Sequence, residues 1–342
     1  MFDQSIQRVG FACKYVHPDQ SLPPKRLKSI QQRLTERATT DKWMKAHMDE
    51  AHNKLWELIQ HNTQSAYNMV QYVGSLPAGQ RMVRLGSDQL PFYTHADWSY
   101  FYKRSDVRDF LERQYARVGD LARELDVRLS MHPGQFTVLA SDRDDVVERS
   151  IDEMEYHADI ARMMGYGAVF QDFKINVHLS GRRGAQGIRD IYGRLSPELR
   201  NMMTIENDEY TSGLRDILEL EDLFALVFDT HHHWVHSNEF IDPQRDDFQR
   251  VIASWRGVRP AMHYSVSRPE YLTEVADDTL PDRNMLKAAG YPSTKLRAHS
   301  DYYTHTASND MIAEFWPYAD IMAEAKMKNL ASTALYNYLM EK

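Results

Sequence analysis

The stretch SDVRDFLERQYARVGDLARELDVRLSMHPG (residues 105–134) contains a helix, a strand and a histidine in succession. Its first part predicts an amphipathic helix, because apolar residues recur at mostly three- and four-residue spacings: Val107, Phe110, Leu111, Ala116, Val118 and Leu121. The short β-rich run VRLSMHPG (127–134) follows and carries His132 before a Pro-Gly turn. A helix that leads into a strand is the repeating unit of an α/β fold.

Similar β-rich segments recur along the chain, with helical periodicity between several of them. They lie at 8–16, 81–87, 173–181, 202–208, 226–232, 261–267 and 295–301, which makes eight with 127–134. Strands that alternate with helices indicate a parallel sheet, so we predict a single (β/α)8 TIM barrel over residues 1–342. Two stretches exceed a minimal barrel. We expect a helical insertion at about 20–75 and, at about 268–294, a long loop that could cover the site.

The composition is that of an ordinary globular protein, with 42% hydrophobic and 26% charged residues. The chain has no run of 18 apolar residues and no secretion signal, and its single cysteine, Cys13, fits a reducing compartment, so we expect a cytoplasmic protein without a membrane span. The net charge of −8 argues against a non-specific nucleic-acid binder. That objection weakens if several divalent cations are bound.

Potential metal ligands gather at the carboxyl ends of the predicted strands, where barrels carry their chemistry. These residues are His132, His178, Glu206, Asp208, Asp229, the run His231–His233, His263, His299 and Asp301, with His95 in the loop after the second strand and Glu324 at the start of an apparent final helix. A lone histidine is usually only hydrogen-bonded, and a strand-end carboxylate such as Asp208 can simply cap a helix. Six successive strands with such a residue at the same end nevertheless favour a metal site.

The types of ligand restrict the metal. No cysteine lies near these residues, which excludes a structural thiolate zinc site. Histidines mixed with carboxylates suit manganese, zinc, magnesium or iron. Eight or nine ligands are too many for one ion, so we expect two or three divalent ions. Paired ions suit in-line displacement at phosphorus.

At these residues the sequence resembles the UV damage endonuclease family, a branch of the endonuclease IV-like barrels. The matching pieces occur in the family's order: RLGSDQLPFYTH (84–95), LSMHPGQF (129–136), VHLSG (177–181), IENDE (205–209), FDTHHH (228–233), RPAMHYS (259–265), AHSDY (298–302) and DIMAEAKMK (320–328). They cover most of the chain from the second strand onward.

The resemblance implies a DNA repair hydrolase that nicks damaged duplex DNA immediately 5′ of UV photoproducts and abasic sites and leaves a 3′-hydroxyl. By position, the residues that match the family's metal site are His95, His132, His178, Glu206, Asp229, His232, His263, His299 and Glu324. Glu206 and Glu324 are the candidates for bridging ligands and, with Asp229, for the catalytic carboxylates. Manganese is the expected metal, with zinc or magnesium as alternatives, and the enzyme is expected to act as a monomer.

The resemblance also implies that Gln135 and Phe136 form a lesion probe that enters the duplex. Without it, HPGQF would be an ordinary Pro-Gly turn with a buried phenylalanine. Phe11, Arg182 and Arg183 are further candidates for DNA contacts, although both arginines could equally be solvated loop charges. The family commonly has tyrosine at the positions of Phe136 and Phe11. It also has a lysine two residues before the strand-seven histidine, where this chain has Ala261.

Two other classes of protein remain open from the residues. A metal-dependent sugar isomerase or epimerase on a similar barrel would use the same kinds of ligands, but it would need a lysine or histidine placed for proton transfer and would give HPGQF no role. A non-catalytic metal- or nucleic-acid-binding barrel is disfavoured by the complete ligand set.

Overall fold

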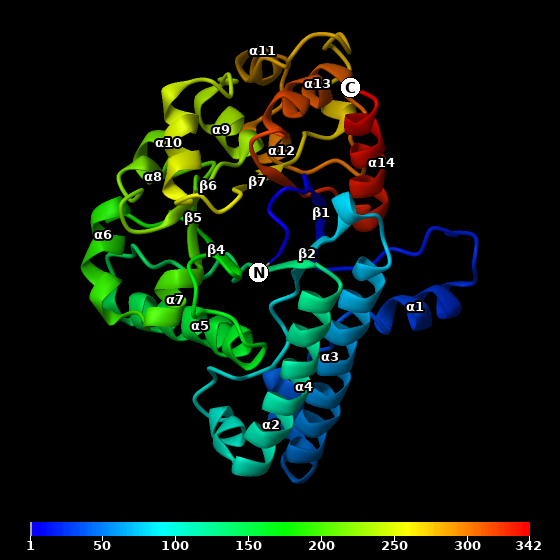
Figure 1. The fold of residues 1–342 in the computed structure, drawn as a ribbon, viewed down its shortest axis with the longest axis vertical. Coiled ribbons are helices and arrows are strands. Elements are labelled where there is room, and N and C mark those ends of the chain that lie inside the picture. Colours follow the sequence, from blue (N-terminus) through cyan, green and yellow to red (C-terminus); the bar gives the residue numbers. More distant parts are fainter. Residues whose placement is uncertain (1) are drawn as a thin grey trace.

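Eight short parallel strands form the centre of the molecule in the computed structural model, which describes residues 2–342 (Figure 1). They are β1 Val9–Ala12, β2 Met82–Leu85, β3 Arg128–Met131, β4 Lys174–His178, β5 Met203–Glu206, β6 Ala225–Val227, β7 Ala261–Tyr264 and β8 Asp320–Ala323. Their order in the sheet is β6-β5-β4-β3-β2-β1-β8-β7. The two edges meet where the amide of His263 donates to the carbonyl of Phe228 at 3.0 Å, so the barrel is nearly closed. The predicted fold is confirmed.

Helices surround the strands as an outer layer and form the long connections (Figure 1). The α-helices are α1 Pro24–Gln32, α2 Asp41–Ala46, α3 Ala51–Gly74, α4 Ser105–Glu124, α5 Asp144–Met163, α6 Gly184–Ile191, α7 Pro197–Met202, α8 Leu214–Leu218, α9 Thr230–Ser237, α10 Asp246–Ser254, α11 Arg283–Ala288, α12 Ser293–Leu296, α13 Thr306–Phe315 and α14 Lys328–Met340. Five short 3₁₀ helices join them: η1 Met48–Glu50, η2 Ala78–Gln80, η3 Ser99–Lys103, η4 Tyr192–Arg194 and η5 Pro269–Tyr271.

The predicted eighth strand at 295–301 is wrong. Ser293–Leu296 form the short helix α12, and only His299 makes an isolated bridge, to Ser267. The eighth strand is Asp320–Ala323, which pairs with β1 on one side and β7 on the other. The alanines, methionines and charged residues around it favour a helix in isolation, but pairing with two neighbouring strands overrides that local preference.

The sixth strand is shorter than predicted, because the histidine run lies on a helix. β6 ends at Val227, and α9 begins at Thr230. Asp229 is the N-cap of α9, and its Oδ1 accepts the amide of His232 at 2.7 Å. This cap fixes where the strand ends and directs the first turn of α9 toward the barrel mouth.

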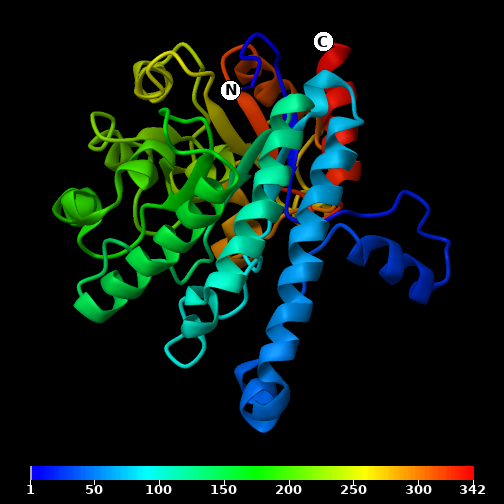
Figure 2. The same cartoon turned by 60° about the horizontal axis from the view of Figure 1, so that its bottom comes forward.

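The predicted insertion at 20–75 contains α1, α2, η1 and α3. Helix α3 packs along α4, and its first turns, together with α2, extend well beyond the rest of the barrel (Figure 2). Helix α1 has no buried residue and stands out from the side of the molecule in both views. The long connection at 268–294 contains η5, α11 and the start of α12.

The amino end of the barrel is held by buried ion pairs. Asp320 lies between Arg128 and Arg259, each with a nitrogen 2.7 Å from one of its oxygens, and Asp320 and Arg128 are almost fully buried. Chemistry in such barrels belongs to the other end, so we assign this network to stability. Among the described residues, no helix is both long and apolar enough to cross a membrane.

Candidate metal centre

Side chains from six strands meet at the carboxyl end of the barrel. His132 directly follows β3, His178 ends β4, Glu206 ends β5, and Glu324 directly follows β8. Asp229 and His232 come from the cap and first turn of α9, and His263 lies within β7. Parallel strands in register bring these ends to one level, as the pairing of His178 with Glu206 illustrates.

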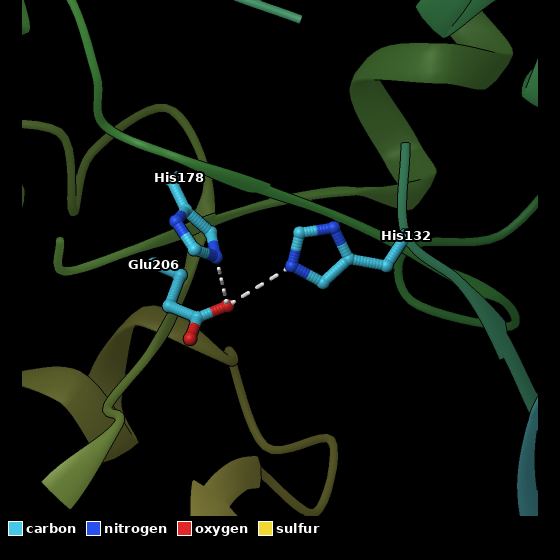
Figure 3. Close-up of side chains that lie close together, drawn as sticks. All are labelled: His132, His178 and Glu206. Atoms are coloured by element: carbon cyan, nitrogen blue, oxygen red, sulfur yellow. Dashed lines mark ion pairs between the residues drawn. The ribbon is translucent and has the colours of Figure 1, made fainter. Parts of the chain in front are cut away.

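Glu206 is the centre of this cluster and is completely buried. Its Oε2 lies 3.4 Å from Nε2 of His132 and 3.6 Å from Nε2 of His178, which approach from two sides (Figure 3). The same oxygen lies 3.2 Å from Nδ1 of His263, and Oε1 lies 3.2 Å from Nδ1 of His232. One carboxylate therefore has four imidazoles around it.

Two more carboxylates complete the cluster. Oε1 of Glu324 lies 3.3 Å from Nδ1 of His263 and also accepts a hydrogen bond from the guanidinium of Arg84. Within the described chain, Oε1 of Glu206, Oδ2 of Asp229 and Nδ1 of His263 are buried and have no hydrogen bond of good geometry, although opposite donor or acceptor atoms lie within ion-pair distance. Buried polar atoms normally have partners, so these three atoms point to a ligand that the protein would bind.

The charged groups of the cluster shift one another's pKa values. Burial alone would raise the pKa of Glu206, but the imidazoles of His263 and His178 outweigh burial and hold that pKa well below its usual range. Burial alone would lower the pKa of His232, and the charges of Asp229 and Glu206 instead raise it well above the ordinary value. Burial raises the pKa of Asp229 to about 7. Such opposed shifts are typical of a site that positions charge for function.

The donor atoms fit divalent cations. Three sets within this cluster have their ligand atoms within 4.8 Å of one another: His132, His178 and Glu206; His178, Glu209 and His232; and Glu206, Asp229 and His263. Imidazole nitrogens and carboxylate oxygens suit manganese, zinc or iron, and no thiolate is among them. Because Glu206 belongs to two of the sets, it could bridge neighbouring ions.

Comparison with known proteins assigns the family. The model of the UV-endonuclease UvdE family matches residues 7–342. The chain belongs to this family. The resemblance seen in the sequence is thereby confirmed.

Among UvdE relatives, the UV-damage endonuclease of Schizosaccharomyces pombe is 30% identical over 266 residues, which are 74% of this chain and 39% of that protein. The UV DNA damage endonuclease of Bacillus velezensis is 25% identical over 318 residues, 88% of this chain and 87% of that protein. The chain thus spans only about two fifths of the S. pombe relative. The crystal structure of SacUVDE has the same fold, with a TM-score of 0.71 at 21% identity and 98% of each chain covered.

Four residues beside the candidate metal centre were not predicted from the sequence: Lys174, Asn176, Arg84 and Glu209, whose Oε2 lies 3.7 Å from Nε2 of His232. Lys174 is buried, and its Nζ lies 2.9 Å from Nε2 of His263, while Asn176 donates to Oε2 of Glu206. Lys174, Asn176 and His178 alternate along β4 and so share one face of the strand. This alternation is visible in KINVH (174–178) and could have indicated both Asn176 and Lys174.

Other predicted site residues lie apart from the cluster. Nε2 of His95 is 3.7 Å from Oδ1 of Asp41, and His95 can group with Asp41 and Asp97 instead. His299 is nearer: at the margin of the cluster its imidazole interacts with Glu324 and His232, and its ring centre lies 5.8 Å from that of His231. Phe11 is wrong as a DNA contact, because it is 1% exposed in the core and packs edge-on against Tyr72.

The neighbours of His232 and the loop carboxylate Asp208 have local partners. His231 shares hydrogen bonds with the Ser265 hydroxyl and the Leu296 carbonyl, and His233 faces Glu239. Asp208 accepts the amides of residues 210 and 211, so it caps a turn rather than a helix.

A groove of about 820 Å³ leads away from His132 and His178. Gln135 and Phe136 line one part of it, and Tyr210 lines another, with the guanidinium of Arg297 4.9 Å from the centre of its ring. Phe136 is 86% exposed, so the alternative of a buried turn phenylalanine is wrong. Arg182 and Arg183 lie in the loop after β4 and pair with Asp142 and Asp190.

Proposed function

We propose that this chain is a metal-dependent endonuclease that nicks duplex DNA immediately 5′ of UV photoproducts and leaves a 3′-hydroxyl, and that it also cuts at abasic sites. The observation that carries the proposal is the convergence of four imidazoles on the buried Glu206, with buried oxygens of Glu206 and Asp229 that lack a hydrogen bond of good geometry in the described chain. Membership of the UvdE family supports it, and so does the match to the Bacillus velezensis protein, which covers 88% of this chain and 87% of that protein.

The proposed metal ligands comprise carboxylates and imidazoles. Glu206, Glu324 and Asp229 would supply the anionic ligands and His132, His178, His232 and His263 the neutral ones, and Glu206 and Glu324 are the candidates for carboxylates shared between ions. Two or three divalent ions, preferably manganese, would acidify a water and offset charge on the leaving 3′ oxygen when bound. His299 lies beside Glu324 and could act as a further ligand there, whereas His95 would have to approach the cluster. Arg84 fixes the orientation of the Glu324 carboxylate through its hydrogen bond.

Gln135 and Phe136 are suited to probe the duplex. They line the groove beside the metal centre and also a second hollow of about 1290 Å³. An exposed phenylalanine on the ridge between two hollows can fill the space left by extruded bases, and the Gln135 amide can replace their lost hydrogen bonds. Arg182 and Arg183 would contact phosphates only after leaving their carboxylate partners.

The sugar isomerase alternative has one observation in its favour, the buried amine of Lys174. However, that amine is engaged with Nε2 of His263, whose other ring nitrogen faces Glu206 and Glu324. An exposed Phe136 beside an open groove also has no role in such an enzyme. We therefore prefer the endonuclease.

The test is incubation with an end-labelled, UV-irradiated duplex and Mn²⁺. We expect nicks beside dipyrimidines that EDTA abolishes. Intact damaged DNA at high enzyme concentration, with manganese, zinc and magnesium each tried, would refute the proposal.

A substitution assigns the role of the carboxylate. Glu206→Gln keeps the shape but removes the shared negative charge, and we expect cleavage to fall by at least about 10³-fold, equivalent to about 4 kcal/mol of transition-state stabilisation. Glu270→Gln, at an exposed glutamate that pairs only with Arg268, is the matched control. Equal activity of the two variants would contradict the assignment.

We further propose that the enzyme works as a monomer in the cytoplasm. The half-buried Cys13 is the single cysteine and needs no oxidising compartment. Sedimentation of the metal-loaded protein, alone and on DNA, tests the oligomeric state.

A further inference from the structure

The arm that carries α1 is unusual in its charge. We define the basic arm as residues 20–37. Its part from residue 20 to residue 35 contains four basic side chains and no carboxylate, in a chain with 49 acidic and 41 basic residues. Lys25, Lys28 and Arg33 are exposed and line a groove of about 650 Å³ together with Ser29, Gln32, Arg37 and His61.

These cations are not used inside the protein. Among the described residues, no carboxylate lies within the 4.0 Å ion-pair distance of Lys25, Lys28 or Arg33. Many exposed arginines elsewhere are paired, such as Arg189 with Asp222 at 2.6 Å, so the arm differs in gathering several unpaired cations on one short segment. Like charges three residues apart on one helix repel each other, as Lys25 and Lys28 do. The cluster therefore weakens the isolated chain and is suited to an external polyanion.

The arm is fixed to the barrel by its backbone. The side chain of Asn62 on α3 accepts the amide of Arg37 at 2.7 Å and donates to its carbonyl at 2.9 Å. Asn68 on the same helix donates to the carbonyl of Arg33 at 2.8 Å. These contacts hold the groove in place without engaging the side chains of Lys25, Lys28 or Arg33.

The arm also lies toward the end of the barrel that carries the candidate metal centre. It follows β1 and so leaves the barrel at the carboxyl ends of the strands, where the metal centre lies. It stands out sideways beside α3, the helix whose first turns extend past this end (Figure 2). A rod-shaped substrate across the metal centre could reach it.

We infer that the basic arm is a docking surface for the phosphate backbone of duplex DNA that flanks the cleavage site. The inference rests on the proposed endonuclease function. Contacts to phosphate carry no sequence or lesion information, so the arm strengthens binding to damaged and undamaged duplex alike. It compensates locally for the net charge of −8, which otherwise repels DNA.

The test compares two triple variants in EDTA. Lys25→Gln/Lys28→Gln/Arg33→Gln removes three charges from the arm. Arg194→Gln/Arg200→Gln/Arg256→Gln removes three at the amino end of the barrel, next to β5 and β7. Fluorescence anisotropy measures binding to damaged and undamaged duplexes between 50 and 200 mM KCl, and circular dichroism verifies folding.

We expect the slope of log affinity against log salt to become shallower by about 2.7 for the arm variant, which is about 0.9 for each of three phosphate contacts. Over this range the unmodified protein should therefore lose about 40-fold more affinity than the arm variant. The control should keep the original slope. With manganese, the arm variant should need more DNA for half-maximal cleavage at an unchanged maximal rate.

Equal slopes for the unmodified protein and the arm variant would overturn the inference, and so would a loss confined to damaged duplex. If the unmodified protein cleaves DNA and the slopes are equal, only the docking surface is refuted. If it does not cleave, the proposed function fails, whereas the slope on undamaged duplex still decides about the arm. Loss of binding to phosphatidylserine vesicles with unchanged DNA slopes would assign the arm to a membrane and overturn the inference.

Discussion

Lys174 offers a prediction in which stability and function move in opposite directions. It begins β4, is 3% exposed, and has its Nζ 2.9 Å from Nε2 of His263. In the described chain no carboxylate lies within 4.0 Å of it. Burial lowers the pKa of Lys174 from 10.5 to about 7. The folded protein therefore holds this ammonium at a cost in free energy.

The direction and size of the effect on the free energy of unfolding follow from the difference in proton binding between the folded and the unfolded chain. Between pH 7 and pH 10.5 the unfolded chain keeps a proton on Lys174 that the folded chain has lost, so stability rises with pH in this window. The pKa differs by about 3.5 units between the unfolded and folded chain, and each unit corresponds to about 1.4 kcal/mol. Burial of the ammonium therefore lowers the free energy of unfolding by about 5 kcal/mol at low pH and by about 4 kcal/mol at pH 7. Lys174→Met removes this penalty and also a hydrogen bond of about 1 kcal/mol. It should stabilise the metal-free protein by about 3 kcal/mol at pH 7 and by about zero at pH 10.

The assay is urea unfolding followed by circular dichroism, in EDTA, at pH 7, 8.5 and 10. Lys103→Met, at an exposed lysine, accounts for general alkaline effects. A difference between Lys174→Met and the unmodified protein that does not change with pH, or a variant that is less stable at pH 7, would refute the reasoning. Cleavage should fall about 10- to 100-fold, because the imidazole of His263 loses the group that orients it.

Three further predictions concern the scaffold, metal binding and the probe. Asp320→Asn should destabilise the protein by about 3–5 kcal/mol, because it leaves the guanidinium of Arg128 buried without its partner; unchanged urea unfolding would contradict this. The pKa of His232 is raised by Asp229 despite burial, so Mn²⁺ must displace a proton, and its affinity should fall about tenfold per pH unit below that pKa. Calorimetry in two buffers of different ionisation enthalpy should show proton release, and its absence would exclude this coupling. Phe136→Ala should weaken binding to damaged duplex in EDTA by about 1–3 kcal/mol while Phe136→Tyr preserves it; equal anisotropy titrations for both variants would exclude stacking.

The barrel could be predicted because its strands and helices differ in periodicity, and because a metal-ligand residue repeats at strand ends. His178 and Glu206 were predictable for that reason, and the register places them side by side. The eighth strand was not, since DIMA (320–323) has only four residues and lies among good helix formers. Its strand conformation depends on pairing with β1 and β7, which no local pattern contains.

The direction in which individual side chains point also could not be predicted from the sequence. Phe11 lies near the carboxyl end of β1, the end at which the candidate site lies. Both faces of a barrel strand are covered, one by the barrel interior and one by helices, so burial does not show which way a side chain points. The sequence therefore could not say that the ring of Phe11 packs on Tyr72 instead of facing DNA. His95 follows β2 as expected. The position of its long loop depends on α2, because Asp41 of α2 lies beside the His95 ring. Such positions are set by the insertion at 20–75, which has no counterpart in a minimal barrel.

Lys174 also bears on the absence of a lysine at position 261, where the family resemblance led us to expect one. Ala261 cannot reach His263, but the amine of Lys174 arrives on its Nε2 from β4, a strand that does not pair with β7. Nδ1 of His263 is then left to face Glu206 and Glu324, at 3.2 and 3.3 Å. A lysine retained only for packing would be expected to pair with a carboxylate or to be replaced by an apolar residue, since its burial is unfavourable by several kcal/mol. Its position against His263, a histidine of the candidate metal centre, instead favours a role in orienting that ring, so Lys174→Met should be both more stable and less active than the unmodified protein.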